Sequence, residues 1–387
     1  MVKAYLKKTR DSRVRSGHPW VFRSDIERTE GAFEPGDVAE VRSAAGTFLG
    51  RAFYNPNSQI SLRMLTQHDE EIDAAFFHKR VEEAWAYRKR FCDTESCRAI
   101  YAESDFIPAL ILDKFGSVCA MQSLSLGLEK WKDVLVEAIV DVIKPTGIYE
   151  RDDVPVRRLE GMEQKTGLLY GEVPDQVEMT ENGIKYLVDV KNGQKTGFFL
   201  DQKENRAAIA PLCPGARVLD CFCHNGSFAL NAAQYGAKSV LGVDISEDAL
   251  VVARENARIN CLEATFEAHN CFDHLRELTE QKEQYDLVIL DPPAFTKSRS
   301  TVESALRGYK EINLRGLKLT KPGGFLVSCS CSQHVHSDMF IDMINKSARD
   351  GKRKVRMVEY RTQAHDHPIL PASPETQYLK CAIMQIM

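Results

Sequence analysis

Residues Tyr285–Phe295 read YDLVILDPPAF, and residues Phe325–Cys331, about thirty residues later, read FLVSCSC. Each stretch contains a run of apolar residues that predicts a buried strand. The first strand delivers Asp291 at its carboxyl end, and the second delivers two thiols, Cys329 and Cys331. Ligands of open α/β sheets bind outside the carboxyl ends of the strands. We therefore expect a carboxylate and a thiol to face one substrate.

Strand-like and helix-like segments alternate through the C-terminal half of the chain, from about residue 191 onward. The predicted strands are 217–219, 239–243, 265–268, 287–290 and 325–328, with helices such as 227–235 and 247–260 between them and a final pair of strands at 354–361 and 378–384. This alternation is typical of a parallel sheet. The expected fold class is therefore α/β, with a Rossmann-like domain over residues 191–387.

The N-terminal half has a different pattern. Short apolar segments at 38–41, 47–53 and 60–65 are separated by Pro-Gly, Ala-Gly and Asn-Pro-Asn turns, which predicts a small β-rich domain over residues 1–68. Helical periodicity over 70–91 predicts a linker helix. Residues 69–190 as a whole are expected to form this helix and a central α+β domain, with strands at 109–112, 118–123, 147–150 and 186–190 around a helix at 128–143.

The composition is that of an ordinary soluble globular protein, with 43% hydrophobic and 27% charged residues. No apolar run approaches the ~18 residues that a membrane span needs, and the basic N-terminus lacks the apolar segment of a signal peptide. The 11 cysteines have irregular spacing, which favours reduced thiols in the cytoplasm.

The distribution of charge is uneven, although the net charge is only −4. Residues 1–25 contain seven Lys and Arg residues, among them Lys7 and Arg23, against two Asp residues. A local basic group of this kind can bind phosphates on a mildly acidic protein. An ordinary solvated surface explains the charge run about equally well.

Residues 217–228 read RVLDCFCHNGSF, which predicts a strand, Asp220 at its end, a tight turn with Gly226, and a helix. This arrangement presents backbone N–H groups to a ligand. The dinucleotide motif G-x-G-x-x-G is absent, so a pyrophosphate is not expected. The next strand ends in Asp244, which suits the hydroxyls of a ribose. S-Adenosylmethionine, an adenosine ligand without a diphosphate, fits this pattern.

The segments VLDCFCHNGSF, VDIS, HNCF and LVILDPPAF occur in this order. They resemble motifs I to IV of the class I S-adenosylmethionine-dependent methyltransferases. The resemblance implies cofactor contacts by Asp220 and Gly226 at the methionine end, by Asp244 at the ribose, by Asn270 and Cys271 at the adenine, and by Phe222, Ile245 and Asp291 beside these. Asp is common at the position of Asn270, but the amide still offers a carbonyl acceptor.

A thiol and a carboxyl group at neighbouring strand ends suit the methylation of cytosine at carbon 5. That carbon is a poor nucleophile until a thiolate adds to carbon 6, and a carboxylic acid at N3 assists the addition. Cys331 or Cys329 would supply the thiolate and Asp291 the acid. Taken alone, a cysteine is more often a small core residue. Three pairs of residues could look like zinc ligands, namely Cys221/Cys223, Cys329/Cys331 and His334/His336. A zinc site is not favoured, because their spacing is C-x-C and H-x-H rather than C-x₂-C.

The turn DPPAF allows a second interpretation. Methyltransferases of exocyclic amines use a D/N-P-P-aromatic turn, in which the aromatic ring stacks on the planar amine. Here the aromatic residue, Phe295, comes one residue later, after Ala294. An N-methyltransferase acting on guanine in rRNA or on a protein is therefore the alternative function. A non-catalytic RNA-binding assembly factor is a third hypothesis.

Several segments together are similar to the bacterial 23S rRNA cytosine-5 methyltransferases with an N-terminal PUA domain. They are GQKTGFFLDQKENR (193–206), ILDPPAFTKS (289–298), RGYKEINL (307–314), SCSCSQHV (328–335) and DHP (366–368), and the resemblance spans essentially the whole chain. It implies an RNA-binding PUA domain, a central α+β domain and a class I methyltransferase domain. It also implies rRNA or an assembling ribosomal particle as the partner, without a metal or a membrane, and it leaves a homodimer open.

The same resemblance assigns roles to individual residues. Cys331 would be the nucleophile, preferred to Cys329 because it lies further past the strand end, and Asp291 would be the acid. Lys195, Phe199 and Gln202 would fold over the cofactor, although interdomain packing explains these three about equally well. The implied substrate contacts are Lys195, Pro292, Phe295, Lys7 and Arg23.

Overall fold

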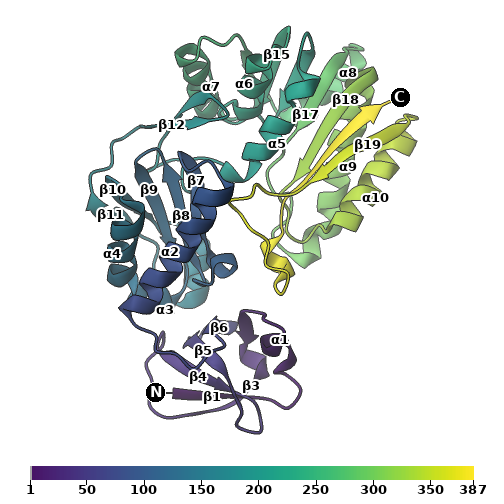
Figure 1. Cartoon of the computed structure of the whole chain (residues 1–387). Coiled ribbons are helices and arrows are strands. Elements are labelled where there is room, and N and C mark those ends of the chain that lie inside the picture. The colour runs from purple at the N-terminus through teal and green to yellow at the C-terminus, as the bar shows by residue number, and fades with distance from the viewer. Residues whose placement is uncertain (1) are drawn as a thin grey trace. The chain divides into compact units, whose positions relative to one another are not determined.

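The computed structural model describes residues 2–387 and divides the chain into two compact units. The first unit contains residues 1–179, 188–200 and 365–376, and the second contains residues 180–187, 201–364 and 377–387. The chain therefore passes between the units several times. No helix in the described part is long and apolar enough to cross a membrane. Figure 1 shows the elements coloured along the chain.

The N-terminal part of the first unit is a six-stranded sheet around a small apolar core. The strand order is β2-β6-β5-β4-β1-β3, with one short helix, α1 (Ser12–Arg15), beside it. The alternating burial of β1 places Val2, Ala4 and Leu6 in the core. The β-rich region predicted before residue 69 therefore contains β1 (Val2–Leu6), β2 (Trp20–Phe22), β3 (Ile26–Glu30), β4 (Val38–Arg42), β5 (Phe48–Tyr54) and β6 (Ile60–Thr66).

The rest of the first unit contains a long helix packed on a five-stranded sheet. The helix α2 (Ala74–Phe91) begins where the Asp73 side chain accepts a hydrogen bond from the Phe76 N–H, 2.8 Å away. Such an N-cap stabilises a helix by about 1 kcal/mol. The sheet has the order β11-β10-β9-β8-β7, formed by β7 (Ser96–Tyr101), β8 (Leu110–Phe115), β9 (Val118–Ser123), β10 (Gly147–Arg151) and β11 (Thr166–Gly171).

The helix expected at 128–143 is interrupted in the structure. It forms two helices, α3 (Leu126–Lys130) and α4 (Lys132–Ile143), which meet at Trp131. The Trp131 ring packs against Phe77 of α2 with 4.9 Å between ring centroids. The periodicity of the sequence could not reveal this break, because the packing partner of Trp131 lies more than fifty residues away.

The second unit is built on a seven-stranded sheet of order β16-β15-β14-β17-β18-β20-β19. The first five strands in this order are parallel to one another, and β20 is antiparallel to both β18 and β19. The strands are β14 (Arg217–Cys221), β15 (Ser239–Asp244), β16 (Thr265–Ala268), β17 (Tyr285–Leu290), β18 (Thr320–Ser330), β19 (Val355–Arg361) and β20 (Lys380–Ile386). A separate hairpin is formed by β12 (Val177–Glu181) and β13 (Ile184–Val188).

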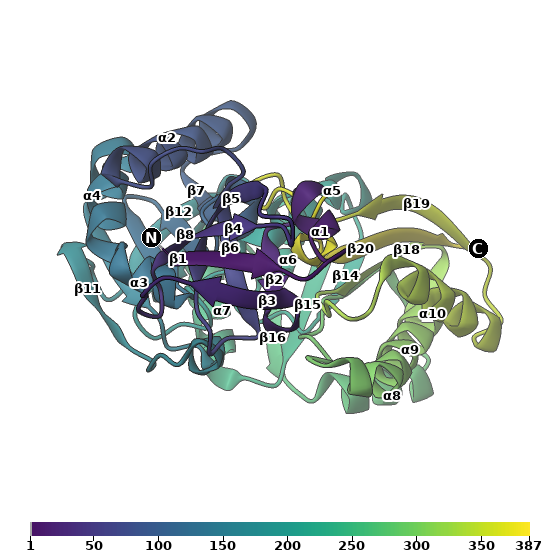
Figure 2. The ribbon, with the colours of Figure 1, turned by 90° about the horizontal axis from the view of Figure 1, so that it is seen from below.

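Helices cover this sheet on both faces. Figure 2 shows α8 (Cys271–Glu280), α9 (Val302–Leu319) and α10 (Ser337–Asp350) together on one face. Their buried residues, such as Leu275, Tyr309 and Phe340, form one core with Val288 and Leu326 of the strands. The remaining helices of the unit are α5 (Lys203–Ala208), α6 (Ser227–Gln234) and α7 (Glu247–Ile259). Because β16, β15, β14, β17 and β18 are parallel, their carboxyl ends lie at one edge of the sheet.

Candidate active site

Four parallel strands end in residues that the sequence singled out. Asp220 lies at the end of β14 and Asp244 at the end of β15, while Asp291 follows β17 and Cys331 follows β18. These strands are neighbours in the order β15-β14-β17-β18. Figure 1 shows β17 and β18 side by side in the second unit. The structure thus brings three predicted carboxylates and the predicted nucleophile to one edge.

The loop after β14 has an alternating backbone conformation. Phe222, His224 and Gly226 have positive φ angles of 65°, 50° and 78°. Successive residues that alternate between right- and left-handed conformations turn their N–H groups toward a common point, which suits a ligand oxygen. Phe222 and His224 bear a steric cost there that Gly avoids.

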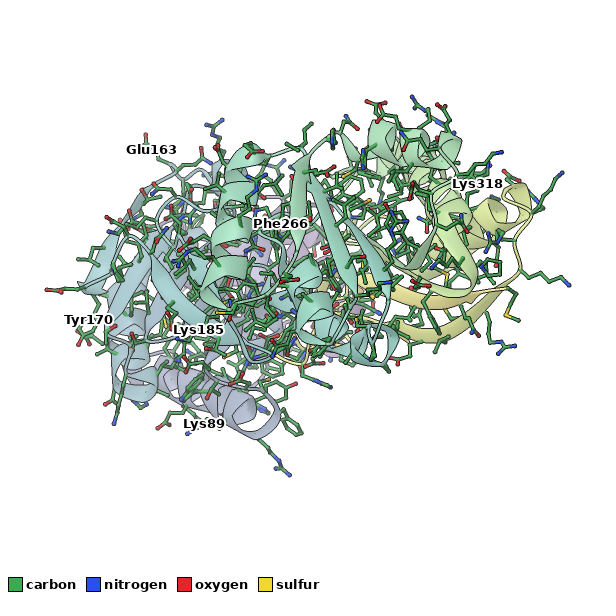
Figure 3. All side chains as sticks on the ribbon, turned by 90° about the horizontal axis from the view of Figure 1, so that it is seen from above. Lys89, Glu163, Tyr170, Lys185, Phe266 and Lys318 are labelled. Carbon is green, nitrogen blue, oxygen red and sulfur yellow. The ribbon has the colours of Figure 1, made fainter. Side chains whose placement is uncertain are left out.

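Gly226 shows how closely this loop approaches its neighbours. A Cβ atom at Gly226 would lie 2.8 Å from the ring of Phe266 on β16, which is labelled in Figure 3, and 3.1 Å from the Cβ of Ala253. The positive φ angle and the lack of space both require glycine. The sequence prediction of a tight turn at Gly226 is therefore confirmed.

Asp220 is fully buried, and only one of its two carboxylate oxygens accepts a hydrogen bond. Its Oδ2 accepts a hydrogen bond from the Ala229 N–H at 2.9 Å, while its Oδ1 has no partner among residues 2–387. Burial, with the nearby Asp291 charge in addition, raises the pKa of Asp220 well above its ordinary range. A buried unpartnered acceptor is costly. A cationic donor, such as the amino group of a methionine moiety, would satisfy it, so Asp220 fits S-adenosylmethionine.

Asp244 and Ile245 form the next part of the edge. The two carboxylate oxygens of Asp244 each accept one backbone N–H, from His224 and from Ser246, both at 2.9 Å. Each oxygen retains a second lone pair for a ribose hydroxyl. Ile245 is 71% exposed, which leaves an apolar surface beside this carboxylate. Both residues fit an adenosine ligand.

Asn270 and Cys271 have structural partners that the sequence did not reveal. The Asn270 Oδ1 caps α8 by accepting the Phe272 N–H at 2.9 Å. The Cys271 thiol is buried, accepts the Phe222 N–H at 3.3 Å and donates to the Val243 carbonyl at 3.5 Å. Cys271 therefore fixes the loop after β14 to the end of β15. The adenine contacts of both residues stay predictions.

A chain of polar side chains holds Asp291. The Gln202 Nε2 donates to the Asp291 Oδ1 at 2.9 Å, and the Asn205 Nδ2 donates to the Gln202 Oε1 at 2.7 Å. The Asn205 Oδ1 in turn accepts from the Arg361 Nε at 3.0 Å. Each partner fixes which way the next amide points. Gln202, predicted as a cofactor contact, is thus a direct partner of the predicted acid, and Asn205 and Arg361 were not predicted at all.

Cys331 lies against the turn that follows Asp291. Its thiol donates to the Pro292 carbonyl, with 3.8 Å between Sγ and oxygen. The next residue, Ser332, links the same two loops, because its hydroxyl lies 3.4 Å from the Thr296 N–H and 2.9 Å from the Tyr309 hydroxyl. Cys331 is partly exposed. It is therefore both accessible and held next to Asp291 and Pro292.

Cys329 differs from Cys331 in every respect that matters for reactivity. It is fully buried and faces Cys381 across the β18–β20 pair. A hydrogen bond with Cys381, together with burial, raises the pKa of Cys329 well above its ordinary value. In the same way, a hydrogen bond with Cys271 and burial raise the pKa of Cys221. Both thiols are held in the protonated form in the core.

Phe295 packs into an aromatic cluster. Its ring centroid lies 4.5 Å from that of Tyr309, 5.6 Å from that of Phe272 and 6.5 Å from that of Phe222. Pro292 is buried beneath the Cys331 loop. The predicted substrate contacts of Phe295 and Pro292 remain predictions.

The other predicted contacts belong to the first unit. Lys195 and Phe199 lie in the segment 188–200, where the Lys195 ammonium is 4.7 Å from the Phe199 ring. Lys7, just after β1, and Arg23, just after β2, are exposed. The structure describes these four residues only within their own unit, so their roles stay predictions.

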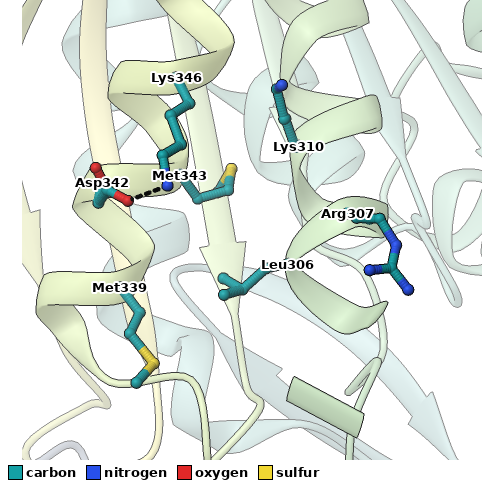
Figure 4. A pocket seen from close by; sticks show the side chains of 7 residues that line it. All are labelled: Leu306, Arg307, Lys310, Met339, Asp342, Met343 and Lys346. Carbon is teal, nitrogen blue, oxygen red and sulfur yellow. Dashed lines mark ion pairs between the residues drawn. The ribbon is translucent and has the colours of Figure 1, made fainter. Parts of the chain in front are cut away.

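Two further features of the molecule lie apart from these residues. A groove of about 210 Å³ between α9 and α10 has an apolar floor of Leu306, Met339 and Met343 (Figure 4). Its Lys346 pairs with Asp342 at 2.7 Å.

In the first unit, Glu129, Glu150 and Asp152 place carboxylate oxygens within 4.8 Å of one another. Three cations neutralise this cluster, namely Lys132, Arg157 and Lys165, so its charge is balanced by protein.

Comparison with known families agrees with this geometry. Residues 4–67 match the PUA-like domain family, and residues 158–379 match the S-adenosylmethionine-dependent methyltransferase family. Ribosomal RNA large subunit methyltransferase I from Alteromonas mediterranea is 41% identical over 388 residues, covering 98% of each chain.

Solved structures show the same fold. A protein from Streptococcus mutans described as a SAM-dependent methyltransferase covers 99% of this chain and 100% of its own, with a TM-score of 0.84 and 22% identity. A methyltransferase complexed with SAH has a TM-score of 0.86 with the same coverage and identity.

These matches confirm the predicted fold class, the PUA-like domain and S-adenosylmethionine as the cofactor. The family match covers more than half of the chain, and the relative from A. mediterranea is similar from end to end. The chain therefore belongs to the S-adenosylmethionine-dependent methyltransferases, in the family that includes ribosomal RNA large subunit methyltransferase I.

Proposed function

We propose that this chain transfers a methyl group from S-adenosylmethionine to carbon 5 of a cytosine in 23S ribosomal RNA, through a covalent Cys331 adduct. The observation that carries the proposal is the 3.8 Å contact between the Cys331 thiol and the carbonyl of Pro292, the residue after Asp291. The relatives named as large-subunit rRNA methyltransferases support rRNA as the substrate, and with it a cytoplasmic location. The PUA-like domain supports RNA binding.

The chemistry follows from the two side chains. The Cys331 thiolate adds to carbon 6 of the cytosine and forms a C–S bond, while Asp291 protonates N3. Carbon 5 then has the electron density to take the electrophilic methyl group that S-adenosylmethionine supplies. A base removes the carbon 5 proton, Asp291 recovers the N3 proton, and the C–S bond breaks to release the thiolate. A stacked target base must first be extruded into the site.

The N-methyltransferase alternative has less support. It requires the Phe295 ring to stack on the amine, and this ring is packed against Tyr309 and Phe272. It also leaves Cys331 without a role, although this thiol is accessible and lies beside the acid. We therefore favour the carbon 5 reaction.

A covalent trap tests the proposal. Protein, S-adenosylmethionine and an rRNA transcript containing 5-fluorocytosine are incubated and separated on a denaturing gel. Fluorine cannot leave as a proton, so the adduct should persist as a shifted band. The band should be lost in Cys331→Ala and kept in Cys329→Ala. If wild type gives no band yet methylates ordinary rRNA, the carbon 5 reaction is ruled out in favour of amine methylation.

A further inference from the structure

Lys380, the first residue of β20, is a buried lysine without a carboxylate partner. Only 3% of the surface of this residue is exposed. The Nζ donates to two backbone carbonyls, those of Ser332 at 2.7 Å and Tyr378 at 2.8 Å. Within residues 2–387, no carboxylate lies at ion-pair distance from it. A buried charge that is not paired is costly, so this lysine requires a reason.

The other buried cations of the molecule show the usual solution. Arg206 is paired with Glu181 at 2.6 Å, Arg88 with Asp105 at 2.5 Å, and Arg63 with Glu160 at 3.0 Å. Each guanidinium thus has a carboxylate in direct contact. Lys380 departs from this pattern, because its ammonium contacts two backbone carbonyls and no carboxylate.

The backbone contact of the ammonium points to a partner for its charge. Lys380 is directly opposite Ser330 in the antiparallel β18–β20 pair. Its ammonium binds the carbonyl of Ser332, the residue that follows Cys331, and so lies beside the Cys331 loop. Burial lowers the pKa of Lys380 to about 8, and the charge of Cys331 acts on it in the opposite direction.

Other titratable groups near this lysine are already engaged elsewhere. Cys381, the next residue on β20, is hydrogen-bonded to Cys329 in the core. The Tyr309 hydroxyl is bound to the Ser332 hydroxyl, and Asp201 accepts a hydrogen bond from the Tyr378 hydroxyl at 2.5 Å. Asp291 is held by Gln202. Cys331, whose thiol contacts the Pro292 carbonyl, is the titratable group on the loop that Lys380 holds.

We propose that Lys380 is the counter-ion of the Cys331 thiolate. The two carbonyls hold the ammonium in place, and its charge stabilises the ionised sulfur, which is the reactive form of a thiol. On ionisation the Cys331 proton passes to solvent and Lys380 keeps its three protons, so the pair becomes neutral. Lys380 is thus a positioning residue, and the inference rests on the proposed role of Cys331 as nucleophile.

The test measures thiol ionisation in the full-length protein without RNA. Wild type is alkylated with iodoacetamide over a range of pH, and mass spectrometry follows the peptides that contain Cys331 and Cys261. Cys261 is exposed and serves as the internal reference. An opposite charge nearby shifts ionisation by about one pH unit or more. Half-maximal alkylation of Cys331 should therefore lie about one unit below that of Cys261.

Two variants separate charge from packing. Lys380→Met keeps the volume and removes the charge, so it should raise the half-maximal pH of Cys331 by about one unit and leave that of Cys261 unchanged. Lys380→Arg keeps the charge and should retain most of the difference.

Two outcomes would overturn the proposal. The first is a wild-type Cys331 that titrates at or above Cys261, a comparison that needs no variant to fold. The second is a Lys380→Met protein in which the Cys331 curve does not move. If the alkylation curves are as expected but no adduct forms on 5-fluorocytosine RNA, the proposed cytosine reaction is contradicted and the Lys380–Cys331 ion pair is not.

Discussion

Gln202 contributes to the orientation of Asp291 through the 2.9 Å hydrogen bond from its Nε2 to the carboxylate. Replacement by Met removes the hydrogen bond to the carboxyl group at nearly constant volume. A hydrogen bond to a charged group contributes about 1.5–3 kcal/mol. We expect Gln202→Met to slow adduct formation on 5-fluorocytosine RNA about 10- to 150-fold, measured in single-turnover reactions, with the KM for RNA unchanged.

Asn205→Asp is a second perturbation of the same polar chain, and it changes the shape of the site very little. An aspartate cannot donate to the Gln202 Oε1, so the Gln202 amide should turn and present its oxygen to Asp291. We therefore expect a similar loss of rate. If both variants formed the adduct at the wild-type rate, the polar chain from Arg361 to Asp291 would have no catalytic importance.

Among single residues, the sequence predicted those that a local pattern of neighbouring residues marks. Asp291 and Cys331 stand at the ends of apolar runs, and the structure places them in adjacent loops. Lys380 and Asn205 were missed for the opposite reason. Lys380 reaches Ser332 through an antiparallel pairing that no local pattern encodes, and only a charged residue at the start of the apolar run LKCAIMQI marks it.

Among the elements, the loop between β14 and α6 is the most constrained. Gly226→Ala would add a Cβ at φ 78° within 2.8 Å of the Phe266 ring. Gly215→Ala is the matched control, since Gly215 has φ 73° and nothing within 4 Å. We expect about 1–2 kcal/mol of destabilisation from the backbone in both variants, and about 1–3 kcal/mol more from overpacking in Gly226→Ala.

Urea denaturation measures the free energy of unfolding of both variants, and calorimetry measures their affinity for S-adenosylmethionine. Only Gly226→Ala should lose affinity, because the added methyl group displaces the loop that we expect to line the cofactor. Equal destabilisation and equal affinity in the two variants would show that the Phe266 contact has no energetic consequence.

The prediction of elements succeeded where the local sequence pattern marks both ends and failed where distant packing decides. The strand predicted at 265–268 is β16 with the same bounds, and the helix predicted at 247–260 is α7 within one residue. The strand expected at 186–190 is instead β13, Ile184–Val188, whose N–H groups are bound by Asn256 of α7 and by Asn260, the residue that follows α7. Such a partner, about seventy residues away, leaves no trace in the local pattern.

For the whole molecule, the PUA-like domain predicts a salt-dependent contribution to RNA binding. Lys7 and Arg23 are exposed on it. Each phosphate contact contributes about 0.7–0.9 to the slope of log affinity against log salt concentration. We expect Lys7→Ala with Arg23→Ala to lower that slope by about 1.4–1.8, measured by filter binding to an rRNA fragment.

Lys89→Ala with Lys318→Ala removes the same charge from two other exposed positions, labelled in Figure 3. This control pair should leave the slope closer to that of wild type. An equal loss in both pairs would mean that the RNA responds to the net charge of the protein rather than to a site on the N-terminal sheet.

The position of β20 in its sheet has a consequence for biosynthesis. This strand follows β19 in the chain but lies between β18 and β19 in the sheet. While the polypeptide is being translated, β19 has no strand to pair with, and the Cys331 loop has no Lys380. The nascent chain thus carries an ordinary thiol, which reacts slowly with cellular electrophiles. Insertion of β20 completes the sheet. By our proposal it also brings Lys380 to the Cys331 loop and so makes the thiol reactive.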